Sequence, residues 1–149
     1  IIADEPTAGL DMSVQAEVLN LLAEMQGRLG IAILVITHNL NVVRHITDRM
    51  AIMYLGRLVE LAPADELYAE PKHPYTAALF ASVPTVGTGK RRFEAIKGEI
   101  PSPINPPSGC AFHPRCSRAR PICSDIDPAA IAVAPDHFAR CHFPGEDPA

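Results

Sequence analysis

Two acidic residues and one histidine follow short apolar segments near the start of the chain. Asp4 and Glu5 come directly after residues 1–3, and His38 follows the apolar run 31–36 after a single threonine. In open α/β sheets, ligands bind at the edge where the strands end. If the two segments are neighbouring strands, these side chains come close together. Carboxylate oxygens there suit Mg²⁺, which prefers oxygen ligands, although a lone acidic pair is more often a solvated turn.

A second set of candidate residues is a group of four cysteines, Cys110, Cys116, Cys123 and Cys141, spaced C-x5-C-x6-C-x17-C. Structural zinc sites usually contain two cysteines separated by about two to four residues, and both close spacings here are longer. A four-iron cluster is larger, so wider spacings are geometrically easier. His113 and His142 stand beside the cysteines and keep a mixed zinc site open. An iron–sulfur cluster, a zinc site and unligated thiols therefore remain as alternatives.

The elements that position the first set follow a pattern of alternating helix and strand. Asp11 or Ser13 can cap a helix with one apolar face, and Gly30 can end it. The run 31–36 is apolar on both faces, which is typical of a central parallel strand covered by helices on each side. The apolar helix residues are Val14, Val18, Leu21, Leu22, Met25 and Leu29.

Further along, the sequence predicts a short helix over 39–46 and a hairpin of strands 50–54 and 58–61, joined through Gly56-Arg57. Pro63 is expected at the first position of a helix that continues over 64–68, and 74–80 predicts one more short helix. The order of these elements predicts an α/β layer architecture with only part of its sheet present.

The composition is that of an ordinary globular domain, with 149 residues, 48% hydrophobic, 20% charged and a formal net charge of -4. It argues against a disordered or collagen-like chain and against a strongly basic nucleic-acid-binding one. No apolar run reaches the roughly 18 residues that a membrane helix needs. The chain begins with Ile1 and shows no signal peptide, so we interpret it as a fragment that lacks an N-terminal part.

The composition changes sharply near Thr88. Residues 1–89 carry ten acidic and five basic residues, whereas 90–149 carry seven acidic and eight basic residues, most of the prolines and all four cysteines. The sequence therefore predicts two unlike parts, 1–89 and 90–149, of which the second is small and rich in Pro and Cys.

The strand-end residues belong to a longer pattern. The run IIADEPTAGLD at 1–11, followed later by VITHNL at 35–40, resembles the ATPase subunits of ABC transporters from the Walker B motif through the D-loop to the switch-histidine loop. This resemblance implies the C-terminal part of an ABC-type P-loop NTPase domain. The sequence contains no G-x-x-x-x-G-K-S/T phosphate loop and no L-S-G-G-Q signature, so we do not expect this chain alone to form a complete ATP site.

The resemblance also implies roles for individual residues. Asp4 would hold the Mg²⁺ of bound ATP through water, Glu5 would polarise the attacking water, and His38 would contact the γ-phosphate. Gly9 and Asp11 would belong to the D-loop, which communicates across the dimer of ATPase subunits. Phosphoryl transfer is catalysed mainly by such positioning and electrostatics.

The rest of the chain resembles a more specific group. EPKHPYTAAL at 70–79 resembles the His-Pro-Tyr-Thr segment of oligopeptide and dipeptide importer ATPases, and GEIPSPINPPSGC at 98–110 resembles their C-terminal extension. By itself, His73-Pro74-Tyr75 predicts a helix start. Related ATPases carry a four-iron cluster in this extension, and a reducing cytosol disfavours disulfides. We therefore expect a 4Fe-4S cluster on Cys110, Cys116, Cys123 and Cys141, with Zn²⁺ as the alternative.

The function that the resemblance implies is ATP hydrolysis that energises the uptake of oligopeptides or dipeptides through an ABC importer. The subunit would lie peripherally at the cytoplasmic face of the bacterial inner membrane. Its partners would be a second, paralogous ATPase subunit, two transmembrane permease subunits and, indirectly, an extracytoplasmic peptide-binding protein, with no nucleic acid. The alternative hypothesis is a metal-binding interaction module with no ATPase role, in which 90–149 matter and the strand-end acids are incidental.

Overall fold

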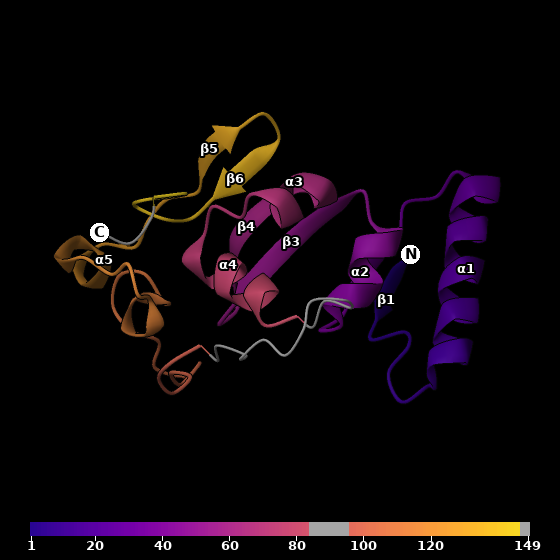
Figure 1. The fold of residues 1–149 in the computed structure, drawn as a ribbon, viewed down its shortest axis with the longest axis horizontal. Coiled ribbons are helices and arrows are strands. Elements are labelled where there is room, and N and C mark those ends of the chain that lie inside the picture. The colour runs from indigo at the N-terminus through magenta and orange to yellow at the C-terminus, as the bar shows by residue number, and fades with distance from the viewer. Residues whose placement is uncertain (84–95, 147–149) are drawn as a thin grey trace, which may run out of the picture. The chain divides into compact units, whose positions relative to one another are not determined.

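The chain folds into two compact units, Ile1–Thr47 and Asp48–Ala149. The computed structural model in Figure 1 describes residues 1–83 and 96–146. Both units contain helices and strands, which confirms the mixed α/β prediction at this level. Within the described residues, no helix is both long enough and apolar enough to cross a membrane.

The first unit contains a pair of parallel strands, β1 (Ile2–Asp4) and β2 (Leu34–Ile36), and two helices, α1 (Met12–Leu29) and α2 (Leu40–Ile46). The register pairs Ile2 with Leu34 and Asp4 with Ile36. The two strands therefore end side by side at the same edge, as the sequence predicted for neighbouring strands. The predicted helix over 39–46 is also confirmed as α2.

Helix α1 has both of its predicted ends. Asp11 is the N-cap residue, and its side chain accepts hydrogen bonds from the backbone N–H groups of Ser13 and Val14. Gly30 ends the helix in the left-handed region, with a φ of 62°, where a residue without a Cβ is unstrained. The capping signals in the sequence were therefore sufficient to place both ends of this helix.

Strand β2 is shorter and more exposed than the sequence predicted. The run 31–36 suggested a strand covered on both faces, but only Leu34–Ile36 are in strand conformation, and Leu34 and Ile36 are 58% and 49% exposed. Among the described residues, β2 has β1 as its one paired neighbour. The prediction of a doubly covered strand is therefore wrong for the structure of this chain.

The second unit is built around a four-stranded antiparallel sheet in the order β3-β4-β6-β5. Strands β3 (Arg49–Tyr54) and β4 (Arg57–Pro63) form the predicted hairpin, with Gly56 at a φ of 75° in its turn. Strands β5 (Ile131–Ala134) and β6 (His137–Ala139) were not predicted. Because β6 pairs with β4, the last part of the chain completes the sheet that the hairpin begins (Figure 1).

Two short helices follow the hairpin. Helix α3 (Ala64–Ala69) begins one residue later than predicted, because Pro63 is the last residue of β4 and the N-cap rather than the first helical residue. Helix α4 (Pro74–Ala81) starts as predicted, with Pro74 at its first turn and His73 as its N-cap. The aromatic rings of Tyr54, Tyr75 and Phe112 pack against one another at centroid distances of 4.7 and 5.3 Å, which ties the sheet to α4 and to the later chain.

The Pro-rich part of the chain is held by turns and two very short helices, η1 (His113–Arg115) and α5 (Pro121–Asp125). Residues 84–95, where the composition changes, lie outside the described residues. At Gly109 two backbone segments approach closely, since a Cβ added there would lie 2.4 Å from the carbonyl oxygen of Cys123. The neighbouring Cys110 N–H donates to that carbonyl at 2.8 Å. This contact brings the first and third cysteines together.

Candidate functional site

The first candidate site lies where β1 and β2 end. Glu5 follows β1 in the left-handed region, with a φ of 45°, and its N–H donates to the Ile36 carbonyl at 2.8 Å. His38 follows β2 after Thr37. Because the strands are parallel and in register, the residues after them lie at one edge. The structure therefore brings Glu5 and His38 together, as the sequence predicted.

The Glu5 carboxylate receives hydrogen bonds from both residues that follow β2. Its Oε1 lies 2.7 Å from the ring Nδ1 of His38 and accepts from the His38 N–H at 3.1 Å. Its Oε2 accepts from the Thr37 hydroxyl at 3.2 Å. The hydrogen bond from the His38 ring is the largest cause that lowers the pKa of Glu5, and partial burial opposes it. Glu5 is thus an ionised acceptor at neutral pH.

The loop between β1 and α1 carries the other predicted residues of this site. Asp4 is the last residue of β1 and is exposed, and Gly9 has a φ of 74°. Asp11 acts as the helix cap, and the Ser13 side-chain hydrogen bond is the largest cause that lowers its pKa. The Gln15 amide reaches back from α1 to the loop carbonyls of Thr7 and Leu10. The loop is therefore tied to the first turns of α1.

The second candidate site is a pocket in the second unit. All four cysteines line it, together with His73 and Pro74 from the start of α4. None of the four is in a disulfide. The structure therefore brings together the four thiols that the sequence singled out, even though they come from the loop before η1, the loop after it, helix α5 and the segment after β6.

Burial disfavours the ionised form of Cys110, Cys116 and Cys141. It raises the pKa of Cys110 and of Cys116, and it raises the pKa of Cys141 to about 11. The nearby cysteines add a smaller contribution of the same sign, because thiolates repel one another. As the side chains stand, no three or more His, Cys, Asp and Glu residues within 1–83 and 96–146 are arranged to hold one metal ion. Four thiols that line one pocket are the donor type of a thiolate-bound centre. Their side chains as they stand do not form a closed set of ligands.

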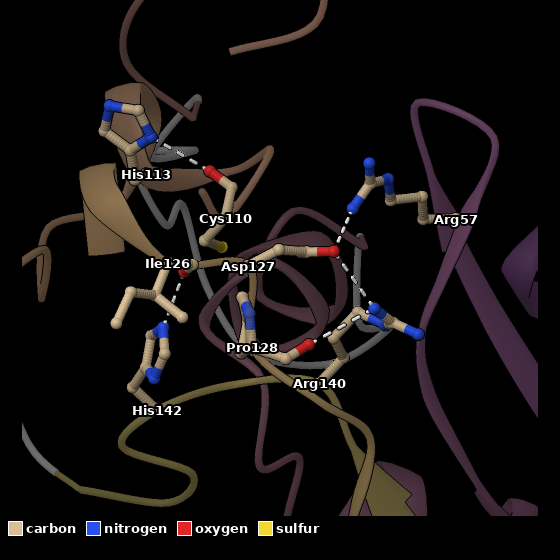
Figure 2. A network of polar contacts seen from close by, with 8 residues as sticks. All are labelled: Arg57, Cys110, His113, Ile126, Asp127, Pro128, Arg140 and His142. Atoms are coloured by element: carbon tan, nitrogen blue, oxygen red, sulfur yellow. Dashed lines mark hydrogen bonds and ion pairs between the residues drawn. The ribbon is translucent and has the colours of Figure 1, made fainter. Parts of the chain in front are cut away.

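The two histidines beside the cysteines are held by backbone carbonyls, as Figure 2 shows. His113 Nδ1 lies 2.9 Å from the carbonyl oxygen of Cys110, and His142 Nε2 lies 2.8 Å from that of Ile126. Each ring therefore has one nitrogen within hydrogen-bond distance of a backbone carbonyl.

An ion-pair network lies beside the pocket. Figure 2 shows the Asp127 carboxylate between the guanidinium groups of Arg57 and Arg140, with the second pair at 3.3 Å. Arg140 also donates to the Pro128 carbonyl at 3.2 Å. The network joins the β3–β4 hairpin to the residue just before Cys141.

Sequence reasoning missed a deeply buried polar cluster of the second unit. The Glu60 carboxylate, on β4, accepts from the N–H groups of Lys72 and His73 at 2.6 and 3.0 Å, and His137 Nε2 lies 2.7 Å from it. Glu60, His73 and His137 are all at most 2% exposed. A glutamate inside an otherwise apolar strand was the one signal in the sequence that could have identified it.

Sequence reasoning also missed Thr37, which contributes one of the Glu5 contacts. Its position between the apolar strand and His38 was visible in the sequence, but a hydroxyl at a strand end has many ordinary roles. Only its contact with Glu5 in the structure distinguishes it.

Comparison with known proteins gives the chain its relatives. Residues 59–123 match the family described as "Oligopeptide/dipeptide transporter, C-terminal region". The chain is 52% identical over 146 residues to the oligopeptide transport ATP-binding protein AppF of Bacillus subtilis, covering 96% of this chain and 44% of that protein. It is 51% identical over 143 residues to the probable peptide ABC transporter ATP-binding protein y4tS of Sinorhizobium fredii, covering 95% of this chain and 40% of that protein.

A third relative, the putative oligopeptide transport ATP-binding protein YkfD of Bacillus subtilis, is 47% identical over 146 residues, or 96% of this chain and 44% of that protein. The chain thus spans less than half the length of these relatives. Nearly all of its residues align with them, and the family match includes the His-Pro-Tyr segment and the first three cysteines. Residues 59–123 thus match the C-terminal region of oligopeptide/dipeptide transporters, and nearly the whole chain is similar to part of the ATP-binding proteins named above.

Proposed function

We propose that the intact protein is an ATP-hydrolysing subunit that energises the uptake of oligopeptides or dipeptides through an ABC importer. The single observation that carries this proposal is the contact between Glu5 and His38 at the ends of two parallel strands, 2.7 Å apart. The three relatives described above are named as ATP-binding proteins of peptide transport. Two strand-end acids, one of them in contact with a histidine, are the part of an ATPase site that this chain can supply.

In the reaction, the oxygen of a water molecule bonds to the γ-phosphorus while the bond to the bridging oxygen breaks, which leaves ADP and inorganic phosphate. Glu5 would orient and polarise this water, because its carboxylate is ionised and lies at the strand edge. His38 would turn toward the γ-phosphate, and its ring is 85% exposed and free of packing that would prevent such a turn. Asp4 would hold Mg²⁺, which supplies charge neutralisation on the phosphates.

The loop that contains Gly9 and Asp11 would serve as the D-loop facing the second ATPase subunit. Its attachment to α1 through Asp11 and Gln15 supports this role, because a contact with a partner needs a loop of defined shape. We further propose that 1–89 are the C-terminal portion of a P-loop ATPase domain and that 90–149 are the peptide-transporter extension.

The partners in this proposal are a second, paralogous ATPase subunit, two transmembrane permease subunits and, indirectly, a peptide-binding protein outside the membrane. The subunit would act peripherally at the cytoplasmic membrane face. The relatives' names support this assignment through peptide transport and ATP binding. They do not support the alternative of a metal-binding interaction module without an ATPase role.

The test of the ATPase proposal is Glu5→Gln in the intact subunit within its transport complex. The amide keeps the size of the side chain but cannot act as a base, so nucleotide binding should persist while steady-state hydrolysis falls by about 100-fold or more. His38→Ala should also impair turnover. Hydrolysis by Glu5→Gln at the wild-type rate would show that Glu5 has no role in the reaction, and the ATPase proposal would then be refuted.

The four cysteines support a second, separate proposal. We propose that they hold one thiolate-bound centre, a 4Fe-4S cluster with Zn²⁺ as the alternative. Their convergence on one pocket supports it, although the side chains as they stand do not form a closed ligand set. When bound, such a centre would cross-link a turn-rich segment.

Purification of the intact protein without oxygen, followed by iron, sulfide and zinc analysis, tests this second proposal. Iron with matching sulfide supports the cluster, and zinc without sulfide supports the alternative. If neither metal is found and all four thiols are alkylated in the native protein, the centre does not exist.

A further inference from the structure

Thr37 stands between β2 and the histidine of the first candidate site, and its hydroxyl makes two hydrogen bonds. The oxygen accepts from the Asn39 N–H at 3.2 Å and lies 3.2 Å from Glu5 Oε2. An ionised carboxylate can only accept, so the hydroxyl must donate to it. With one side of the oxygen engaged by Asn39, the single hydroxyl proton is directed at Glu5.

The two carboxylate oxygens of Glu5 therefore have different hydrogen-bond partners. Both donors from His38 meet Oε1, whereas Thr37 meets Oε2. The His38 ring is 85% exposed, whereas Thr37 is half-buried beside its strand. A movement of the ring would release part of Oε1 and leave the hold on Oε2 intact.

The backbone of Glu5 is fixed in an unusual conformation next to these side-chain contacts. The φ of Glu5 is 45°, a conformation that a residue with a Cβ rarely adopts. The N–H of Glu5 is fixed by the Ile36 carbonyl. The contact with Thr37 fixes the far end of the same side chain.

We infer that Thr37 is the positioning residue for Glu5, holding the carboxylate through Oε2 while His38 exchanges Oε1 for the γ-phosphate. This inference rests on the proposed ATPase function. It explains how Glu5 can keep a defined orientation toward water at the moment when the histidine leaves it. Thr37 itself touches neither water nor nucleotide in this role.

The experiment uses the intact subunit in its transport complex. Thr37→Val keeps the branched shape and removes the hydroxyl, and Thr37→Ser is the matched control that keeps the hydroxyl. A hydrogen bond to a charged group is strong enough for kcat to fall about tenfold or more in Thr37→Val. The KM for ATP should stay within about twofold of wild type, because the contact serves the transition state rather than binding. Thr37→Ser should restore most of kcat.

A double variant separates positioning from general damage. Adding Thr37→Val to Glu5→Gln should cause no further loss of turnover if the effect of Thr37 on the reaction passes through the Glu5 carboxylate, whereas loss of its contact with the Asn39 N–H would act independently of Glu5. Three results would overturn the inference: a wild-type kcat in Thr37→Val, an equal loss in Thr37→Ser, or a further loss in the double variant. If the Glu5→Gln variant hydrolyses ATP at the wild-type rate, the proposed ATPase function is refuted. If Glu5→Gln is inactive but Thr37→Val hydrolyses ATP at the wild-type rate, only the positioning role of Thr37 is refuted.

Discussion

Glu60 and His137 are 77 positions apart in the chain, yet His137 Nε2 lies 2.7 Å from Glu60 Oε1, with both side chains buried. The same carboxylate accepts from the backbone N–H groups of Lys72 and His73, just before α4. One side chain thus joins β4, the His-Pro-Tyr segment and β6. A buried carboxylate with several donors is expensive to disturb, because each donor loses its partner when the carboxylate is removed.

Replacement of Glu60 should therefore loosen β6. We expect Glu60→Leu to lower the free energy of unfolding of the second unit by about 3 kcal/mol, because three donors, two of them buried, lose their acceptor. Hydrogen exchange of the intact protein should show faster exchange over 137–141. Glu60→Gln is the matched control. Its free energy of unfolding should lie between those of the wild type and Glu60→Leu, since it keeps one acceptor oxygen. Unchanged exchange in Glu60→Leu would mean that the cluster does not hold the strand.

His73 should make the second unit less stable in acid. Burial lowers its pKa from 6.5 to about 4, so between these pH values the unfolded chain binds a proton that the native protein does not. Stability from this residue is complete above pH 6.5 and is lost as pH falls toward about 4, by about 3 kcal/mol in total.

Denaturant titrations at pH 7 and pH 5 would measure this effect. His73→Asn is the control, because asparagine can still accept the hydrogen bond from the Tyr75 N–H that caps α4 but does not titrate. The variant should show a smaller loss between the two pH values. An equal loss in both proteins would assign the pH dependence to other groups.

Gly109→Ala should strongly lower the free energy of unfolding of the second unit. The added Cβ would lie 2.4 Å from the Cys123 carbonyl oxygen and 2.8 Å from backbone atoms of Ser124, at a φ of 64°. We expect a loss of more than about 3 kcal/mol, together with altered alkylation of Cys110 and Cys123. Gly56→Ala is a matched control, because its φ of 75° gives similar strain but a Cβ there meets no atom within 4 Å. Its cost should be about 1 kcal/mol, and equal costs in the two variants would exclude the clash as the cause.

Asp127→Asn should have a much smaller effect. Its carboxylate pairs with Arg57 and Arg140, but Asp127 and Arg57 are 40% and 44% exposed, so water screens the charges. We expect a loss below about 1 kcal/mol that shrinks further in high salt. A loss as large as that of Glu60→Leu would show that the network, rather than the buried carboxylate, holds the later chain in place.

The sequence was informative wherever a local signal decided the structure. Asp11 and Gly30 placed both ends of α1, and Pro74 placed the start of α4, because caps act over a few residues. The contact between Glu5 and His38 followed from two apolar segments that each ended in a polar residue. These predictions needed no knowledge of distant contacts beyond the pairing of two strands.

The second unit was harder to predict because its key contacts are distant in sequence. Strand β6 is three residues long, and its pairing with β4 depends on partners far along the chain. The burial of Glu60 depends on the same pairing. The spacing of the cysteines indicated a common site, but their convergence depends on Gly109, whose close approach to Cys123 has no signature in a single sequence.

The pairing of β4 with β6 also sets an order of events during synthesis. Hairpin β3–β4 can form as soon as its own residues have left the ribosome, because its contacts are local. The edge of β4 that later receives β6 must then wait while more than seventy further residues are made, as the separation of Glu60 and His137 requires. An open strand edge is a template for pairing with another chain. The last strand of the sheet therefore ends a period in which the nascent chain is exposed to aggregation, and a protein shortened before His137 would keep that edge open permanently.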